Sequence, residues 1–500
     1  MRLILRMQSG DRELELRDGE TLLEALRRNG YYVPAACGGR GVCGKCRVRL
    51  LSGQVEGCNQ EADGSVLACM ARPVGDVVLA WKETAGGGLE SYGGAASAFA
   101  PDGESGLGAA LDVGTTTLAA CLIDLESGKT LARCSALNPQ GAYGADVLSR
   151  IAACADGKLE AMHRLILEEA DRMLAKLLSG RSEAEVRRMT VSGNTTMLHL
   201  FCGVDPSPIG RAPYTPVFTG MQRLNGADLG VRAREILVLP SASGYIGSDI
   251  TGGVLASGMG KRTEVLLDIG TNGEMVLAAG GRLLCTSTAA GPAFEGACIE
   301  CGMGGVAGAV DRVTWDGREL SFTTIEGAPP SGICGSGLID LTAVLVETGL
   351  VDESGSLEEV PGCALSSRVR DDRFYLTDEI WLSQRDIRQY QLAKSAVCAG
   401  LLALLDYAGV PVASIERLLL AGGLGYYIRR ENAVRTGILP RELEERIEVI
   451  GNSSIQGASL CLCSAGARSA LETLAARCEI VELASSAKFN DEYIANMAFL

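Results

Sequence analysis

The sequence predicts an α/β protein of two or three domains. The chain has 500 residues, more than one ordinary hydrophobic core accommodates. From residue 107 onward, apolar strand-like runs alternate with amphipathic helices, a pattern typical of α/β folds. A cysteine-rich segment and a glycine-rich stretch precede them, and together these indicate a separate small domain and a tether.

The small domain is expected over residues 1–84, built from a hairpin, a helix, a loop and strands. Residues 2–7 and 12–17 alternate apolar and polar side chains around a Ser-Gly-Asp turn, which is typical of a β-hairpin. Thr21 and Glu24 form a capping-box pattern ahead of a leucine-rich helix. Two further strands are expected at 47–51 and 76–81.

Four cysteines of this domain predict an iron–sulfur site. Three follow a C-x5-C-x2-C spacing on a glycine-rich loop and the fourth comes from a distant segment: Cys37, Cys43, Cys46 and Cys69. The plant-type spacing C-x4-C-x2-C…C is one residue shorter. Zinc also takes four cysteines, but its sites usually pair two C-x2-C knuckles, and only one is present here. Cys58, in a polar turn, is the alternative fourth ligand.

Composition limits the partners and the compartment. A formal net charge of −15 disfavours a broad surface for nucleic acid or anionic membrane. No run approaches the roughly 18 apolar residues of a membrane span. Charges interrupt the N-terminal apolar stretch before a signal-peptide core forms, so we expect a cytoplasmic protein. Its 18 cysteines should then be mostly reduced or metal-bound.

Two segments share the design of strand, Gly-Thr turn and strand. One reads Ala-Leu-Asp-Val-Gly-Thr-Thr-Thr-Leu over 110–118, and the other Leu-Leu-Asp-Ile-Gly-Thr-Asn-Gly-Glu over 266–274. Such turns offer N–H groups and hydroxyls to phosphates, while the aspartate holds Mg²⁺ through water. The residues expected to bind nucleotide and ion are Asp112, Gly114, Thr115, Thr116, Thr117, Asp268, Gly270, Thr271, Asn272 and Gly273. Two copies of one loop indicate two similar halves that clamp a nucleotide.

Three more segments complete this pattern. Leu418-Leu-Leu-Ala-Gly-Gly-Leu-Gly predicts a buried strand and a bend on which adenosine packs, through Gly422, Gly423 and Gly425. Residues 249–259 and 452–460 predict small-residue helices that cross between the halves. In order, the five segments resemble the phosphate-1, connect-1, phosphate-2, adenosine and connect-2 motifs of the superfamily of actin, heat-shock chaperones and sugar kinases. The absence of G-x-x-x-x-G-K-[ST] disfavours a P-loop fold.

An inactive fold, in which these glycines only serve tight turns, is the alternative. The paired aspartates argue against it, because a buried aspartate without a partner ion is costly. The cysteine loop resembles that of the β-grasp ferredoxin family, over roughly residues 1–82. The expected fold class is α/β, with a β-grasp ferredoxin domain followed by a two-lobed actin-like ATPase domain. The expected domains are 1–84, ferredoxin-type; 85–106, a flexible Gly-rich linker; 107–260, the first lobe; and 261–500, the second lobe with a C-terminal return.

Joined in one chain, the loop around Cys37, the tether and the ATPase motifs resemble the reductive activators of corrinoid-dependent methyltransferases. Four further stretches match that family: 138–147, 191–199, 290–296 and 383–394. The resemblance implies one-electron reduction of a corrinoid (cobalamin-binding) protein from Co(II) to Co(I). It also implies a [2Fe–2S] cluster, ATP and Mg²⁺ as cofactors, an upstream low-potential electron donor, and self-association as a homodimer.

Asp249 and Glu295 are the candidate catalytic residues, expected to position water or contact the partner. Helix capping or core hydrogen bonding is the alternative role for both. Three other functions stay open: an activator of another low-potential metalloenzyme, such as a radical-type acyl-CoA dehydratase; a metabolite kinase with a redox domain; and a chaperone-like actin homologue. Activators of radical-type acyl-CoA dehydratases carry far fewer cysteines per chain than this protein does.

Overall fold

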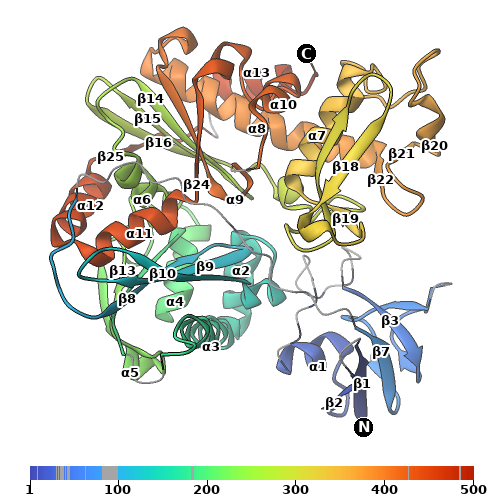
Figure 1. Cartoon of the computed structure of the whole chain (residues 1–500), viewed down its shortest axis with the longest axis horizontal. Coiled ribbons are helices and arrows are strands. Elements are labelled where there is room, and N and C mark those ends of the chain that lie inside the picture. Colours follow the sequence, from blue (N-terminus) through green and yellow to red (C-terminus); the bar gives the residue numbers. More distant parts are fainter. Residues whose placement is uncertain are drawn as a thin grey trace.

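Three sheets carry the architecture, one of five strands near the N-terminus and two of six strands (Figure 1). The computed structural model of the chain describes residues 1–7, 10–29, 31, 33, 39, 41, 46–61, 64–81, 99–181, 185–425, 427–483 and 486–499. Within these ranges, no helix combines the length and the apolar composition that crossing a membrane requires.

The N-terminal sheet forms a small domain with its own hydrophobic core. Its elements are β1 (Arg2–Arg6), β2 (Arg12–Glu15), α1 (Leu22–Arg28), β3 (Arg47–Ser52), β5 (Ser65–Leu67) and β7 (Val77–Ala80), beside a two-stranded sheet of β4 (Val55–Glu56) and β6 (Arg72–Pro73). The strand order β2-β1-β7-β3-β5 includes the predicted antiparallel hairpin. Thr21 Oγ1 accepts the Glu24 amide at 3.2 Å and the Glu24 carboxylate accepts the Thr21 amide at 2.8 Å, so the capping box begins α1.

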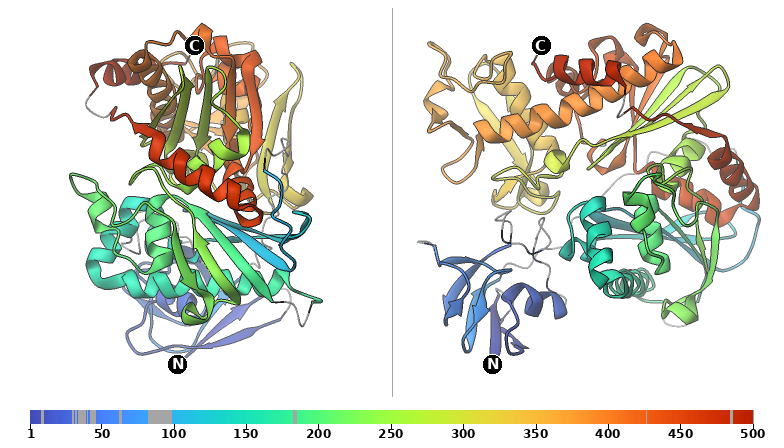
Figure 2. Two further views of the ribbon diagram at one scale, coloured as in Figure 1. Left: turned by 90° about the vertical axis from the view of Figure 1, so that its left-hand side faces the viewer. Right: turned by 180° about the vertical axis from the view of Figure 1, so that it is seen from behind.

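Five strands of each six-stranded sheet follow one topology, and the sixth strand lies at opposite edges of the two sheets. The first contains β8 (Leu107–Val113), β9 (Thr117–Asp124), β10 (Thr130–Leu137), β11 (Val186–Gly193), β12 (Gln222–Asn225) and β13 (Ala233–Val238). The second contains β14 (Glu264–Ile269), β15 (Gly273–Ala279), β16 (Arg282–Thr288), β23 (Arg417–Ala421), β24 (Ile447–Gly451) and β25 (Cys478–Ile480). In each, three antiparallel strands are followed by two parallel ones, β8-β11-β13 and β14-β23-β24. This duplication confirms the predicted pair of similar halves, which lie one above the other (Figure 2).

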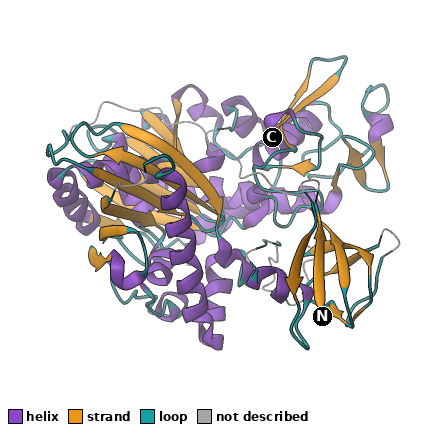
Figure 3. Cartoon of the chain, turned by 60° about the horizontal axis from the view of Figure 1, so that its bottom comes forward, coloured by secondary structure: helices purple, strands orange, loops and turns teal. Residues whose placement is uncertain are grey.

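Each half covers its sheet with helices, which Figure 3 distinguishes from the strands by colour. The first lobe has α2 (Val147–Ala153), α3 (Leu159–Leu177), α4 (Thr195–Cys202) and α5 (Gly226–Leu229). The second has α7 (Gly335–Glu347), α8 (Gln384–Ala408), α9 (Gly422–Gly425), α10 (Arg430–Arg435) and α13 (Ala487–Ala495). It also carries two small sheets, β17 (Ala309–Trp315), β18 (Leu320–Thr324) and β19 (Gly332–Ile333), and β20 (Val369–Arg370), β21 (Arg373–Tyr375) and β22 (Trp381–Ser383).

Two helices are exchanged between the halves. Helix α6 (Ser248–Ser257) follows the first sheet, yet its Ile250 packs with Leu266 of the second sheet. Helix α11 (Ser453–Cys463) follows the second sheet, yet its Ile455 packs with Ala110 of the first; α12 (Ala465–Arg477) continues from it. The contact between α6 and α11 therefore joins the two halves.

Glycines make this crossing close. A Cβ atom on Gly457 of α11 would lie 2.4 Å from the carbonyl oxygen of Gly252 on α6. Real Cβ atoms do not approach a backbone oxygen so closely, so the crossing requires glycine at this position. The structure thus has the tight crossing that the small residues of both segments predict.

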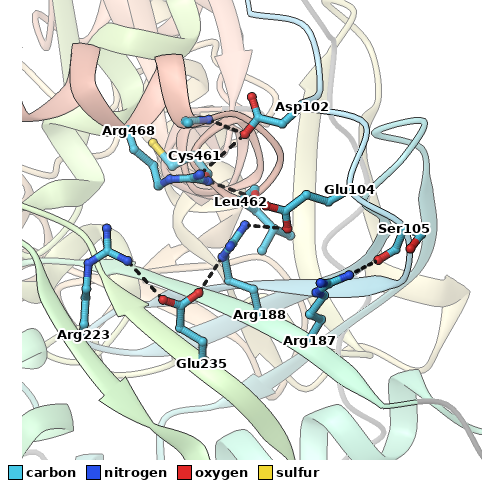
Figure 4. Close-up of polar contacts among 11 residues, drawn as sticks. Asp102, Glu104, Ser105, Arg187, Arg188, Arg223, Glu235, Cys461, Leu462 and Arg468 are labelled. Atoms are coloured by element: carbon cyan, nitrogen blue, oxygen red, sulfur yellow. Dashed lines mark hydrogen bonds and ion pairs between the residues drawn. The ribbon is translucent and has the colours of Figure 1, made fainter.

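Two residues at the end of the segment predicted to be a flexible linker form ion pairs with residues from both halves of the chain. Asp102 lies 3.5 Å from the Arg468 guanidinium of α12, and Glu104 lies 3.2 Å from that of Arg188 on β11 (Figure 4). The flexibility of the linker stays a prediction. Residues 82–98 lie outside the described ranges.

Candidate functional site

Two of the predicted cluster ligands lie together. The Sγ atoms of Cys46 and Cys69 are 3.2 Å apart, and both residues are buried in the small domain. Cys46 immediately precedes β3 and Cys69 follows β5, and the antiparallel pairing of these strands brings the two thiols to one end of the sheet. Cys37 and Cys43 lie outside the described residues, so the four-cysteine set stays a prediction.

Cys58, the alternative fourth ligand, is only partly buried. Burial raises the pKa of its thiol above the ordinary value. A raised thiol pKa disfavours the thiolate that binds metal. The close approach of the Cys69 sulfur to Cys46 therefore favours Cys69 as the ligand from the distant segment.

The two Gly-Thr turns face each other across the lobes, and one carboxylate connects them. Glu295 lies at the end of a short 3-10 helix, Pro292–Glu295. Its Oε1 accepts a hydrogen bond from Thr271 Oγ1 at 2.6 Å, and its Oε2 accepts one from Thr116 Oγ1. Glu295 is therefore neither a helix cap nor a core residue, since it bridges the two predicted phosphate loops.

Asp112, at the end of β8, has two hydrogen-bond donors from α11. Asn452 Nδ2 and Ser454 Oγ each donate to its carboxylate at 2.7 Å. Burial raises the pKa of Asp112, and these two donors oppose that rise. The helix that joins the halves thus holds the aspartate of the first loop.

Asp268, at the same position of the second loop, is held differently. No described residue donates a hydrogen bond to its carboxylate. Burial, together with the negative charges of Asp112 and Glu295, raises its pKa to about 7. A Cβ on Gly422 would lie 2.2 Å from Asp268 Oδ1, and Gly422 has a φ of +86°. The predicted adenosine segment therefore turns directly beside Asp268, and only glycine fits at the turn.

Two more carboxylates lie close enough to Asp268 to interact with its charge. Burial and the charges of Asp268 and Asp112 raise the pKa of Asp249 to about 8. Burial, with Asp249 and Asp268 adding to it, raises the pKa of Glu274 well above its ordinary value. Asp249 accepts the amide of Ile250 at 2.9 Å, so it also serves the first turn of α6. Asp268 thus interacts with four other carboxylates, and we call these five residues the carboxylate cluster: Asp112, Asp249, Asp268, Glu274 and Glu295.

The remaining predicted residues take simpler places. In the first loop, a Cβ on Gly114 would lie 2.5 Å from Thr117 O, and Thr115 Oγ1 accepts a hydrogen bond from Asn194. In the second loop, Gly270 N donates to Asn272 O at 2.9 Å, and Asn272 Nδ2 donates to Glu274. Thr117 is the first residue of β9 and Gly273 is the first residue of β15. The three predicted adenosine-binding glycines, Gly422, Gly423 and Gly425, lie in α9.

The carboxylate cluster does not surround a point where an ion would bind directly. Among the described residues, no group of three or more His, Cys, Asp or Glu side chains lies close enough to hold a metal ion. Their concentration of negative charge nevertheless favours a divalent cation that binds through water and phosphate oxygens, which is how Mg²⁺ is usually held. Such an arrangement can place Mg²⁺-nucleotide between two lobes and stabilise the charge that develops on its phosphates.

Three site residues escaped prediction from sequence. Asn452 and Ser454 were expected only as part of a crossing helix, and Glu274 only as a strand residue. Their role depends on contacts across the two halves that the linear sequence does not display. The one available signal was the polar Asn-Ser-Ser at the start of an otherwise apolar helix.

Models of known families match three successive regions of the chain. The 2Fe-2S iron-sulfur cluster binding domain matches residues 6–74. The RACo middle region matches 107–262, and the C-terminal domain of RACo, the ASKHA domain, matches 262–500. The fold and the site thus define an iron–sulfur protein with a two-lobed, actin-like nucleotide-binding domain.

Individual relatives identify the family to which the chain belongs. The chain is 31% identical over 421 residues to the corrinoid activation enzyme RamQ of Eubacterium limosum, covering 78% of this chain and 70% of RamQ. It is 25% identical over 392 residues to the [Co(II) methylated amine-specific corrinoid protein] reductase of Methanosarcina barkeri, covering 70% and 68%. A solved reductive activator for corrinoid, iron-sulfur protein superposes with a TM-score of 0.74 and 27% identity, over 99% of this chain and 98% of that one. The protein belongs to the family of reductive activators of corrinoid proteins.

Proposed function

We propose that this protein uses ATP to drive one-electron reduction of a corrinoid protein from Co(II) to Co(I). The observation that carries the proposal is that one chain combines the paired thiols of Cys46 and Cys69 with two Gly-Thr loops that meet at Glu295. A bound [2Fe–2S] cluster supplies the electron. Cys37, Cys43, Cys46 and Cys69 hold it, and the Gly-Thr turns hold the phosphates of ATP.

The need for ATP follows from redox energetics. Plant-type [2Fe–2S] clusters have potentials of about −400 mV. For one electron, each ~59 mV of unfavourable difference costs about 1.4 kcal/mol. A gap of a few hundred millivolts therefore needs several kcal/mol, which nucleotide binding can supply if the open and closed forms of the lobes bind ATP with different affinity.

The chain's own residues have distinct parts in this proposal. Asp268 places Mg²⁺ through water, because it has the carboxylate without donors. Glu295 ties the loops together and positions water near the terminal phosphate. Lobe closure then changes how the first and second halves meet at the crossing of Gly252 and Gly457. An external low-potential donor reloads the cluster, and the chain self-associates through its nucleotide-binding half.

A reconstitution experiment tests the proposal. The cluster is assembled anaerobically, a chemical reductant and a Co(II) corrinoid protein are added, and visible spectra follow Co(I) with MgATP, with MgADP and without nucleotide. We expect Co(I) only with MgATP, and none with Cys46→Ser or Cys69→Ser. Phosphate transfer to a small alcohol without Co(I) formation would indicate a metabolite kinase. Co(I) formed equally well without nucleotide would contradict the proposal.

A further inference from the structure

The first phosphate loop is supported from behind by two buried polar side chains. Asn138 and Arg150 are each only 1% exposed, although amide and guanidinium groups rarely lie so deep. Both come from the segment between β10 and α3. Arg150 Nη2 donates to the carbonyl oxygen of Thr115, and its Nε donates to that of Gly144 at 3.0 Å. A cation is thus built into the protein directly beneath the loop.

Asn138 and Arg150 fix three successive carbonyl groups of the loop, two through their side chains and one through the Asn138 backbone. Asn138 Nδ2 donates to Gly114 O at 2.7 Å, Arg150 donates to Thr115 O, and Asn138 N donates to Thr116 O at 2.8 Å. In a trans peptide the C=O and the following N–H point in opposite directions. The Thr115 amide therefore points away from the Asn138 side chain, and the Thr116 amide points away from Arg150.

These two amides have no acceptor among the described residues. An N–H group without a partner is costly unless water or a ligand accepts its hydrogen bond. Two successive N–H groups aimed at one side of a turn form a concave site for an anion. The guanidinium of Arg150 is permanently charged, and its bond to the Thr115 carbonyl polarises that peptide, which makes the Thr116 N–H a stronger donor.

Among the described residues, no arginine or lysine side chain donates to the backbone of the second loop. Its Thr271 carbonyl accepts a hydrogen bond from the backbone N–H of Gly291 at 2.9 Å, a neutral donor. Its Asn272 side chain bonds to Glu274, a carboxylate. Of the two loops, the first is therefore the one whose backbone is polarised by a buried cation.

We propose that Arg150 is a positioning residue for nucleotide phosphates: it fixes and polarises the first loop so that the amides of Thr115 and Thr116 donate to the phosphate chain. This inference rests on the proposed nucleotide binding and adds the residue that gives it selectivity for phosphate over nucleoside. Asn194 assists, because its Nδ2 donates to Thr115 Oγ1 at 3.0 Å. Support of the first loop by these residues explains why two segments outside the five motifs, 138–147 and 191–199, lie around it.

The test compares affinities for ATP and for adenosine, measured with the full chain by competition against a fluorescent ATP analogue and by calorimetry. Arg150→Met removes the charge at similar length, and Arg150→Lys keeps the charge but loses the fork. We expect about 10- to 100-fold weaker ATP binding for Arg150→Met, a smaller loss for Arg150→Lys, and unchanged adenosine binding in both. Arg172→Met, at an exposed arginine of α3, is the matched control and should bind both ligands like the parent protein.

A second variant guards against misfolding. In Asn194→Ser the hydroxyl still accepts the Met197 amide at the start of α4, but no longer donates to Thr115 as the amide does. It should bind ATP about 3- to 10-fold more weakly with adenosine unaffected. ATP and adenosine affinities that fall together, or that both stay unchanged in Arg150→Met and Asn194→Ser, overturn the inference. If the parent protein binds adenosine nucleotides in neither assay, the proposed function itself fails and this inference with it.

Discussion

The two phosphate loops have one sequence pattern but opposite surroundings. Asp112 of the first loop accepts two hydrogen bonds at 2.7 Å, from Asn452 and Ser454, whereas Asp268 of the second accepts none from the described residues. The first loop rests on buried Arg150, whereas in the second loop burial and neighbouring carboxylates raise the pKa of Asp268 to about 7. We propose that the duplicated motif has divided its work, so that the first loop donates to phosphate and the second supplies a carboxylate to a cation.

The largest effect expected from this division is on the paired aspartates. Asp268→Asn should lower Mg²⁺-dependent ATP hydrolysis by more than about 100-fold, roughly 2.7 kcal/mol, because it removes the carboxylate that most needs a cation. Asp112→Asn should lower it by only about 10-fold, since Asn452 and Ser454 already stabilise that position. Steady-state hydrolysis over a Mg²⁺ titration measures both. Equal losses in the two variants would show that the loops are not specialised.

A somewhat smaller effect is expected at the carboxylate where the loops meet. Glu295→Ala should lower kcat for ATP hydrolysis by about 100-fold with little change in KM, because it removes the bridge between Thr116 and Thr271. Glu295→Gln keeps one acceptor and one donor for the two hydroxyls, so its loss should be about 10-fold. A glutamine variant as active as the parent would mean that the bridge matters but the negative charge does not.

The crossing of the exchanged helices predicts a stability effect. Gly457→Ala should destabilise the protein by about 1–3 kcal/mol, because the new Cβ meets the Gly252 carbonyl. Gly466→Ala in α12 is the matched control: its Cβ would have its nearest neighbour at 3.6 Å, so it should be neutral or slightly stabilising. Denaturant unfolding measures both. If Gly457→Ala is as stable as Gly466→Ala, the helices do not cross so closely.

The smallest expected effect is a pH-dependent gain of stability on removing one charge of the carboxylate cluster. The pKa of Asp249 is raised to about 8 in the folded chain, above its unfolded value, so the folded state binds more protons between these values and loses stability as pH rises. Asp249→Asn should therefore raise the melting temperature more at pH 8 than at pH 5, in chelator-treated protein without nucleotide. Scanning calorimetry at both values measures it. A gain that shrinks as pH rises would contradict the raised pKa.

Much of the fold was predictable because its signals are local. The capping box of Thr21 and Glu24, the alternation of β1 and β2, and the paired Asp-x-Gly-Thr turns each act within a few residues. The order of five such segments then fixed the two-lobed architecture. The small residues of α6 and α11 likewise predicted that these helices cross closely.

The site was less predictable because its contacts join distant parts of the chain. Glu295 was expected to be a catalytic candidate, with capping as its alternative, and nothing local indicates that it bridges Thr116 and Thr271. The support of Gly114 by Asn138 and of Thr115 by Arg150 likewise depends on tertiary packing. The ion pairs of Asp102 and Glu104 also join distant parts of the chain, and the composition of the linker does not indicate them.

The most direct measurement is a single turnover. Protein carrying one pre-reduced cluster is mixed anaerobically with excess Co(II) corrinoid partner, free reductant is removed beforehand, and Co(I) absorbance is recorded by stopped flow. We expect up to one Co(I) per chain with MgATP, almost none without nucleotide, and a loss of this difference in Asp268→Asn. The same yield of Co(I) in the presence and absence of MgATP would contradict this expectation.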